Sequence, residues 1–462
     1  MSVSVQFSAT NGSVDIAVVG GGMAGLRVAS AVTGASVAVF ESGPDAGLEH
    51  NNAVMSADEA VRRWVLPNAD PYFRRPWTSA TPPHFTGPSG LRSRVGGCSL
   101  YWYGVSLPME DWALTSWPDA ARSQLLGDGI GSIRGVLEEL SAWSSRDLLD
   151  RTPKFNLADL EFSSSPRAVR EHGGGRWSAW HPALARRVHA QTEVCELVPS
   201  RTGWRVLTAD GGSVEASSVV LAAGAVVNAA LVSSVGAAPG ERRRMNGVED
   251  HITQGVFSVL RGEHARRAAD WLPEGSWYAP APSARSNVFI DVTRLKDELV
   301  LDLRCTGEPS SPGWIDTTRG RDGSLSISVA AGLTHADDPV IGAQRELLGL
   351  LWRQIVELVG ITDHVLDFGE FSSPTRTNEH VLPEHLERLG SGEPSTWASY
   401  LGTEDHEGAS LRMGVAVDED LQVIDAPGLY VAGPAVFPRL GAANPTVTSL
   451  ALATGLAAHL SR

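Results

Sequence analysis

A glycine-rich turn near the N-terminus limits the fold of this chain more than any other feature. The apolar run at residues 13–19 leads directly into the turn Gly20-Gly21-Gly22-Met23-Ala24-Gly25, and a second apolar run over 36–40 ends at Glu41. Strand, glycine-rich turn and helix in this order predict a dinucleotide-binding unit, in which a pyrophosphate reaches the helix N-terminus and Glu41 accepts from a ribose hydroxyl. A plain glycine turn would not account for Glu41. The unit alone does not distinguish NAD from FAD.

Composition and cysteine content exclude several classes of protein. The 462 residues carry a formal charge of −15, which argues against nucleic acid or an anionic membrane as a partner. Cys98, Cys195 and Cys305 are widely spaced, which favours a reducing compartment and gives neither a disulfide framework nor a metal cluster. There is no apolar run of about 18 residues, and residues 1–14 lack a signal-peptide core. We therefore expect a cytoplasmic protein without a metal site.

An aromatic loop follows an irregular, lid-like excursion over residues 43–90, which is rich in Pro, Gly, Asn and Asp. The loop reads Arg94-Val95-Gly96-Gly97-Cys98-Ser99-Leu100-Tyr101-Trp102-Tyr103-Gly104. Its adjacent glycines could lay backbone against a flat ring system, with Tyr101, Trp102 and Tyr103 as walls beside that ring. The alternative is a buried aromatic turn.

The middle of the chain contains further strand-like runs. Residues 187–198, which include Val194, and residues 204–212 predict strands, and a third buried run ends at Ala222-Ala223-Gly224, a second point of close approach. Residues 107–180 look helical and polar. Residues 248–400 alternate short strand-like runs with a helix near 341–359, as in an antiparallel sheet domain.

The C-terminal part carries a histidine and an amide next to small residues. His406 precedes Ser410-Leu411-Arg412-Met413-Gly414, a strand over 428–433 ends at Gly433, and Asn444-Pro445-Thr446 opens an apolar helix to about residue 460. A histidine base, an amide and a helix N-terminus suggest a site where a proton leaves and negative charge develops. Asn444 either caps this helix or holds a substrate oxygen.

Taken together, these segments resemble the glucose–methanol–choline (GMC) oxidoreductases, most closely the pyranose oxidase and glycoside oxidase branch. The specific part is the C-terminal signature, in which His406 stands four residues before Ser-x-Arg-Met-Gly and Val431-Ala432-Gly433 precedes Asn444-Pro445-Thr446. The resemblance implies FAD rather than NAD, His406 as the active-site base and Asn444 as its partner on the substrate oxygen. The expected cofactor contacts are Gly20, Gly22, Gly25, Glu41, Arg94, Gly97, Ser99, Trp102, Val194, Ala223, Gly433 and Thr446.

The expected fold class is α/β plus α+β. A Rossmann-like FAD-binding domain would be assembled from residues 1–110, 183–247 and 404–462, with the excursion over 43–90 as part of it. Residues 111–182 and 248–403 would form the substrate-binding domain on an antiparallel sheet.

Two positions depart from the family pattern. Fungal pyranose oxidases attach FAD through a histidine two places after the loop serine; here that place is Tyr101, so we expect non-covalent FAD. Tyr103 stands where those enzymes have a threonine near the reactive nitrogen of the flavin. Tyr101 and Tyr103 are the candidate substrate contacts.

The function expected from these features is FAD-dependent oxidation of a secondary alcohol of a sugar, glycoside or cyclitol to a ketone, with oxygen or another carrier as electron acceptor. Alternatives are oxidation of a non-sugar alcohol or sterol, or a redox-silent role as a flavin lyase or binding protein. For His251, in the run 247–251, we favour a structural role over a place near the site. A structural role is also the alternative for His406.

Overall fold

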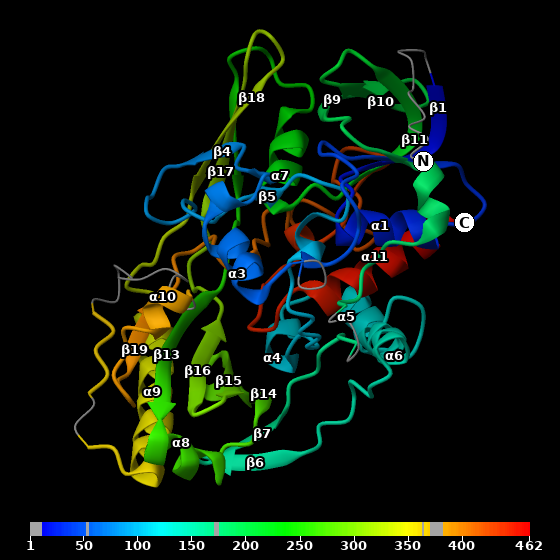
Figure 1. The fold of residues 1–462 in the computed structure, drawn as a ribbon. Coiled ribbons are helices and arrows are strands. Elements are labelled where there is room, and N and C mark those ends of the chain that lie inside the picture. The colour runs from blue at the N-terminus through cyan, green and yellow to red at the C-terminus, as the bar shows by residue number, and fades with distance from the viewer. Residues whose placement is uncertain (1–11, 52–54, 171–174, 363–364, 370–381) are drawn as a thin grey trace.

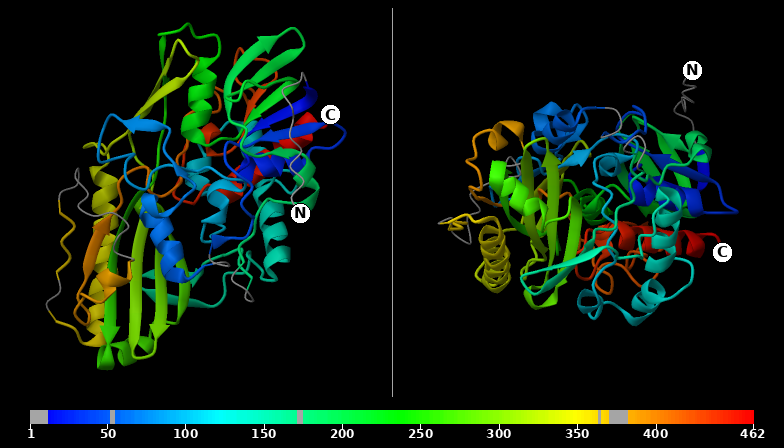
Figure 2. Two further views of the ribbon diagram at one scale, coloured as in Figure 1. Left: turned by 45° about the horizontal axis from the view of Figure 1, so that its top comes forward. Right: turned by 60° about the horizontal axis from the view of Figure 1, so that its bottom comes forward.

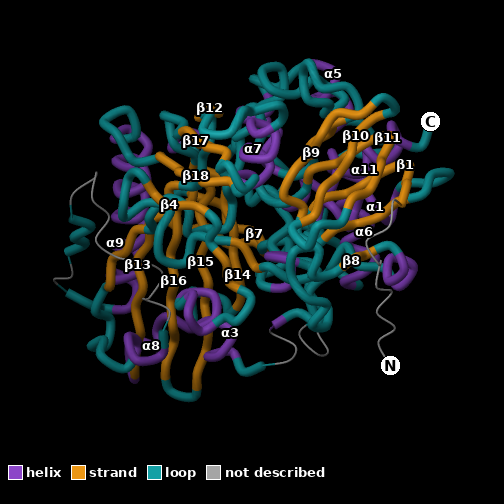
Figure 3. Tube along the Cα trace, turned by 90° about the horizontal axis from the view of Figure 1, so that it is seen from above, coloured by secondary structure: helices purple, strands orange, loops and turns teal. Residues whose placement is uncertain are grey.

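Two large sheets stand side by side in the computed structural model, which describes residues 12–51, 55–170, 175–362, 365–369 and 382–462 (Figure 1; Figure 3). Within these ranges the strands form two seven-stranded sheets, one four-stranded sheet and one two-stranded sheet. The two-stranded sheet pairs β3 (Phe73–Arg74) with β5 (Leu91–Arg92). Among the same residues, no helix has the length and apolarity needed to cross a membrane.

The first seven-stranded sheet is the predicted Rossmann-like sheet, assembled from segments far apart in the chain. Its order is β8-β2-β1-β11-β10-β9, and β20 also pairs with β11. Strands β1 (Gly12–Val19), β2 (Val37–Phe40), β8 (Val188–His189), β11 (Ser213–Leu221) and β20 (Leu429–Val431) run parallel, whereas β9 (Val194–Ser200) and β10 (Gly203–Thr208) are antiparallel. Strand β10 pairs with the first half of β11 and β20 with its last residues.

Because Gly20 and Gly25 have no side chain, the first helix, α1 (Met23–Ala31), can pack close against this sheet. A Cβ on Gly20, which has φ +105°, would lie 2.5 Å from the carbonyl oxygen of Ala222. A Cβ on Gly25 would lie 2.1 Å from the carbonyl oxygen of Gly20 and 3.1 Å from Cβ of Ala222. Any larger residue at either position would push the helix away from β1 and β11.

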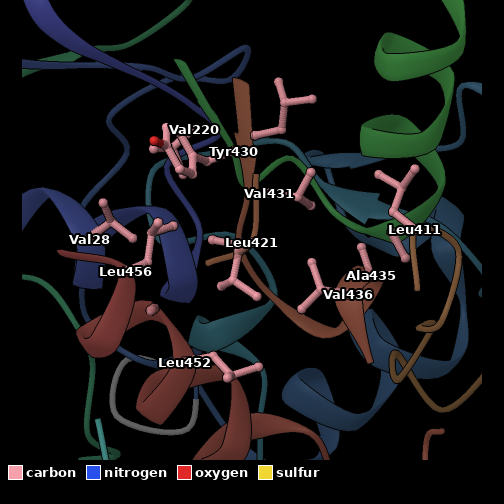
Figure 4. Close-up of a cluster of buried hydrophobic side chains, with 14 of the residues drawn as sticks. Val28, Val220, Leu411, Leu421, Tyr430, Val431, Ala435, Val436, Leu452 and Leu456 are labelled. Carbon is pink, nitrogen blue, oxygen red and sulfur yellow. The ribbon is translucent and has the colours of Figure 1, made fainter. Parts of the chain in front are cut away.

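The C-terminal helix α11 (Thr446–Leu460) packs beside α1 and closes the core of this half. Figure 4 shows buried side chains from α1, β11, β20, α11 and the loops before and after β20 meeting in one cluster, with Val28, Val220, Leu411, Leu421, Tyr430, Val431, Ala435, Val436, Leu452 and Leu456 labelled. The predicted strand that ends before Gly224 is β11, and helix α7 (Ala225–Ser234) follows it. The core therefore joins the N-terminal, middle and C-terminal segments of the chain.

The second seven-stranded sheet is the predicted antiparallel sheet, in the order β19-β13-β16-β15-β14-β7-β6. Its strands are β6 (Lys154–Leu157), β7 (Leu160–Ser164), β13 (Ile252–Arg261), β14 (Gly275–Ala281), β15 (Ser286–Leu295), β16 (Glu298–Gly307) and β19 (Ser395–Ala398). Helices α8 (Gly262–Ala269) and α9 (Asp338–Val359) cover one face, as Figure 2 shows for α9. Alternate residues of β15 and β16, such as Val288 and Leu303, pack under these helices, so the intervening residues face the opposite side.

The smaller four-stranded sheet departs from the predicted division of the chain. Its order is β12 (Arg242–Asn246), β17 (Trp314–Arg319), β18 (Leu325–Ala330) and β4 (Trp77–Ser79). It thus joins β17 and β18, expected in the substrate domain, to strands expected in the FAD-binding domain. The excursion over 43–90 is also less irregular than expected, because it contains β4 and helix α3 (Ala57–Val65), capped where Ser56 Oγ accepts from the Glu59 N–H.

Residues 111–182 likewise differ from the expectation of a helical part of the substrate domain. Helix α4 (Asp111–Leu114) is followed by α5 (Asp119–Leu126) and α6 (Ile133–Ser144), both of which pack against α11 on the Rossmann-like side. The β6–β7 hairpin then crosses to the antiparallel sheet, where β7 pairs with β14. Periodicity identified helices here but could not assign them to a sheet, because the partner α11 lies some 300 positions away.

Substituting Gly25→Ala should lower the stability of the FAD-free protein. Alanine favours a helix over glycine by about 1 kcal/mol, but the new methyl group would overlap the Gly20 carbonyl, and overpacking of this kind typically costs about 1–3 kcal/mol. Urea unfolding of the FAD-free protein measures the difference. Gly22→Ala is the matched control, because a Cβ there meets no atom of the chain within 4 Å and φ is −79°. Equal stability of the two variants would contradict the close-approach account.

Candidate active site

A cavity of about 1470 Å³ lies between the two seven-stranded sheets. At one end it is lined by Gly20, Gly22 and Glu41 from the glycine-rich unit. At the other end it is lined by His406, Asn444 and residues of β15 and β16. A single continuous space therefore connects the dinucleotide unit with the histidine and amide of the C-terminal signature.

The glycine-rich end has the geometry that a dinucleotide requires. The buried Glu41 carboxylate accepts the Gly21 and Gly43 N–H groups at 2.8 Å each, which fixes its position at the end of β2. Burial raises the pKa of Glu41, and these backbone hydrogen bonds oppose the increase. Gly22 lies at the N-cap of α1, faces the cavity and has open space where a side chain would be. That space at a helix N-terminus fits a pyrophosphate.

The aromatic loop forms the adjoining wall. Gly97, Ser99, Trp102 and Tyr103 line the cavity, and a Cβ on Gly97 would lie 3.4 Å from Cα of Gly22. Ser99 Oγ donates to the Gly96 carbonyl at 2.6 Å, which tightens the 3-10 turn Gly97–Leu100. Trp102 Nε1 donates to the Trp177 carbonyl at 3.2 Å. The loop therefore presents backbone and aromatic surface to the cavity.

Two predicted cofactor contacts do not line the cavity. The Arg94 guanidinium lies over the Tyr72 ring at 4.4 Å and donates to the carbonyls of Ala46 and Gly47, at 3.1 and 2.7 Å, so it ties the loop to the excursion instead. Gly25 instead allows α1 to pack closely against the Gly20 carbonyl and the end of β11. The structure corrects the direct-contact expectation for Arg94 because the side chain is buried away from the cavity.

The remaining predicted cofactor contacts lie on the cavity wall. Val194 comes from the start of β9, Ala223 from the turn after β11, Gly433 from the turn after β20 and Thr446 from the first turn of α11. Gly433 has φ +95°, which favours glycine at this turn. Because α11 has 15 residues and its first turn reaches the cavity, its positive end faces any anionic group bound there.

Backbone pairing places His406 at the cavity. Gly408 exchanges N–H···O hydrogen bonds with Glu249, at 3.0 and 3.1 Å, and the residues after it pair with the segment 434–436 that follows β20. Nδ1 of His406 lies 2.9 Å from Nδ1 of His251, a residue for which the sequence favoured a structural role. Burial lowers the pKa of His406 to about 4, so its imidazole is neutral near pH 7 and can accept a proton.

Asn444 lines the same cavity as His406, and its side chain does not cap α11. The helix begins at Thr446 with Pro445 at the N-cap and no side-chain cap. Asn444 Nδ2 donates to the Val105 carbonyl at 2.8 Å, and its buried Oδ1 has no partner among the described residues. The preceding loop is fixed by carboxylates, since Gly441 N–H donates to Glu308 at 2.7 Å and Ala442 N–H to Glu110 at 3.1 Å.

The two candidate substrate residues behave differently. The Tyr101 ring lines the cavity, but the side chain is buried, and desolvation and the Asp70 carboxylate raise its pKa to about 12. Asp70 does not line the cavity, so the Tyr101 hydroxyl is oriented toward the protein interior. Tyr103 also lines the cavity and is 38% exposed, and its carbonyl accepts from Arg167 Nε at 3.2 Å.

Sequence reasoning missed a polar wall formed by β15 and β16. Six side chains on one face of these paired strands line the cavity: Phe289, Asp291, Thr293, Asp302, Arg304 and Thr306. Asp291 and Asp302 are directly opposite each other, and Arg304 pairs with both carboxylates. Burial raises the pKa of Asp302 to about 7. The alternation of these residues with apolar ones was visible in the sequence, although it did not reveal which face meets the cavity.

Acidic residues next to His406 also line the cavity, namely Glu404, Asp405 and Glu407. Burial is the main cause of the raised pKa values of Glu404 and Glu407. These carboxyl groups therefore keep protons to higher pH than usual and can donate as well as accept hydrogen bonds. The sequence showed their cluster but not that it faces the site.

The fold and cavity place a dinucleotide-binding sheet and an antiparallel sheet on one shared cavity. A family model described as GMC oxidoreductase matches residues 363–453. The C-glycoside 3-oxidase of Microbacterium trichothecenolyticum is 43% identical over 67 residues, and this match spans 13% of each protein. The C-terminal part of the chain is thus similar to the GMC oxidoreductases, and a shorter stretch is similar to a glycoside oxidase. Together with the dinucleotide geometry of the cavity, these likenesses support FAD as the cofactor.

Solved structures share the fold along the whole chain. Pyridoxine 4-oxidase from Mesorbium loti superposes with a TM-score of 0.59 at 17% identity, over 96% of this chain and 98% of that one. A variant of formate oxidase from Aspergillus oryzae RIB40 gives a TM-score of 0.60 at 15% identity, over 98% and 99%. At these identities the likeness establishes the fold alone, and it confirms the predicted architecture.

Substituting Gly22→Ala should weaken FAD binding without unfolding the protein. The added methyl group meets nothing in the chain but occupies the open space at the N-terminus of α1. Titration of FAD into the FAD-free protein, followed by flavin fluorescence, should give a dissociation constant raised by about tenfold or more. Wild-type affinity in a normally folded Gly22→Ala variant would show that the pyrophosphate lies elsewhere.

Proposed function

We propose that this protein oxidises a secondary alcohol of a sugar, glycoside or cyclitol to a ketone. The observation that carries the proposal is a neutral His406 and the Asn444 amide lining one cavity, which the polar face of β15 and β16 also lines. Bound non-covalently, FAD supplies the hydride acceptor. The groups that bind the alcohol and take its proton come from side chains of this chain.

His406 removes the hydroxyl proton. Its Nδ1 is engaged by His251, which leaves Nε2 as the nitrogen available to a substrate in the cavity. A neutral imidazole in a desolvated site is ready to accept a proton without first losing one. Asn444 complements this base, because one hydrogen of Nδ2 is donated to the Val105 carbonyl and the other can be donated to the substrate oxygen whose proton His406 accepts.

The polar wall favours a substrate with several hydroxyl groups. Asp291 offers a charged acceptor and Arg304 a charged donor, Asp302 can accept or donate because burial raises its pKa to about 7, and Phe289 adds an aromatic surface beside them. Hydroxyl groups can satisfy these groups, whereas an apolar sterol would cover them without hydrogen bonds, which is costly. This wall therefore supports a sugar-like substrate over the sterol alternative.

The similar proteins support oxidation of a sugar-like substrate in part. The matched C-glycoside 3-oxidase is named for oxidation of a glycoside, and the similar structures are named for oxidation of pyridoxine and formate. Because the glycoside match spans 13% of each protein, we extend only the substrate class. We propose oxygen or another small carrier as electron acceptor. With Tyr101 at the position of the attaching histidine, FAD is held by the cavity alone.

Anaerobic mixing with a panel of sugars, glycosides, aminocyclitols and sterols should bleach the flavin absorbance with a polyhydroxylated member. His406→Ala should slow this reduction by about 100- to 10,000-fold, the usual contribution of a general base. His84→Ala is the control, because His84 is a buried histidine that does not line the cavity. Reduction by no alcohol would refute the proposed activity, whereas reduction at the wild-type rate in His406→Ala would refute the base.

The limiting rate constant for flavin reduction at saturating alcohol should show no loss of the base from neutrality down toward pH 4, whereas protonation of Asp302 near pH 7 should change the alcohol concentration needed for saturation. Burial lowers the pKa of His406 to about 4, so the base is lost only when pH falls through that value. Below it the rate should drop by roughly tenfold per pH unit. Stopped-flow measurements with circular dichroism at each pH would separate this effect from unfolding. A loss of the limiting rate constant centred near pH 6.5, the ordinary histidine value, would contradict a desolvated base.

A further inference from the structure

His251 lies opposite the base because of the backbone register. Glu249 and Gly408 form an antiparallel bridge with hydrogen bonds in both directions. In an antiparallel pair, moving two residues forward on one segment and two back on the other keeps the side chains on the same face. His251 and His406 are the residues reached in this way. Their contact thus follows from the pairing of two segments that are far apart in the sequence.

The contact between the two imidazoles has a defined geometry. Nδ1 of His251 lies 2.9 Å from Nδ1 of His406, and the rings are nearly perpendicular, with an interplanar angle of 78°. Burial lowers the pKa of both rings, so both are neutral near pH 7. A hydrogen bond between two neutral imidazole nitrogens holds one proton, and the position of that proton fixes the tautomer of each ring.

We propose that His251 is a positioning residue that accepts a hydrogen bond from Nδ1–H of His406 and thereby keeps Nε2 of His406 unprotonated toward the cavity. The inference deepens the proposed function, on which it rests. His251 itself is fully buried and does not line the cavity, so it acts through His406 and not on the substrate.

The opposite arrangement would disable the base. If His251 donated instead, His406 would carry its proton on Nε2 and could only donate to a substrate hydroxyl. With Nδ1 of His251 as acceptor, its own proton is on Nε2. Burial and the neighbouring His406 lower the pKa of His251, and the backbone of Gly441 only opposes this lowering. Nε2 of His251 is buried and has no hydrogen-bond partner among the described residues. Gly441 belongs to the loop that carries Asn444, so this loop lies near His251.

The position of His251 is fixed by its neighbours on the chain. Asp250, which is fully buried, accepts the Gly402 N–H at 2.6 Å, and β13 begins at Ile252. The residue is thereby attached to the antiparallel sheet, while His406 belongs to the segment that pairs beside β20. The hydrogen bond between them sets the orientation of the base relative to the substrate sheet.

Nitrogen-15 NMR of the histidine-labelled FAD-bound protein without substrate tests the proposal directly, with His406→Ala used to assign the signals. The wild-type protein should show His406 with a proton on Nδ1 and a bare Nε2. In His251→Leu this tautomer should be lost or mixed with the other. His251→Asn should retain it, because Oδ1 of Asn provides an acceptor near the position of Nδ1. His84→Leu, which removes another buried histidine, should leave the His406 signals unchanged.

Flavin reduction by an active alcohol gives a second readout. His251→Leu should reduce the rate by about tenfold or more, and His251→Asn should recover most of it. A His406 proton on Nε2 in the wild type, or an unchanged tautomer in His251→Leu, would overturn the proposal. If His251→Leu does not fold, the wild-type and His251→Asn spectra still decide it. If no alcohol reduces the flavin, the proposed function fails while the tautomer assignment is judged by its own spectra.

Discussion

The contact between Gly20, Gly25 and the end of β11 is the constraint on which the site depends. It lets α1 start at the cavity and lets β11 pair with β1 along its length. The last residues of β11 in turn pair with β20, and the segment after β20 pairs with the residues that follow His406. The absence of side chains at Gly20 and Gly25 therefore helps to position His406, a residue some 380 positions later in the chain.

Desolvation of ionisable groups in the cavity is the second physical effect on which the site depends. The walls of the cavity bury histidines and carboxyl groups together, and each responds by favouring its neutral form. For His406 the neutral form is the one that accepts a proton, so the same burial that costs solvation energy prepares the chemistry. Backbone N–H groups held by Glu110 and Glu308 fix the loop of Asn444 without using the cavity surface.

Local sequence patterns predicted the features that are set by local geometry. The glycine spacing and Glu41 predicted the dinucleotide unit, and the C-terminal signature predicted that His406 and Asn444 would share a site. What the sequence could not predict depends on long-range pairing. The polar wall required knowing which face of β15 and β16 meets the cavity. The burial of Arg94 against Tyr72 and the contact of His251 with His406 required the relative positions of distant segments.

The most direct test of the central claim is a crystal structure of the protein with FAD and a bound polyhydroxylated alcohol or product. We predict FAD along the cavity from Gly22 toward the C-terminal signature, with a hydroxyl oxygen of the ligand within hydrogen-bond distance of both Nε2 of His406 and the Asn444 amide. The remaining hydroxyl groups should contact the wall formed by β15 and β16. A ligand bound with His406 and Asn444 turned away from its oxygens would contradict the account.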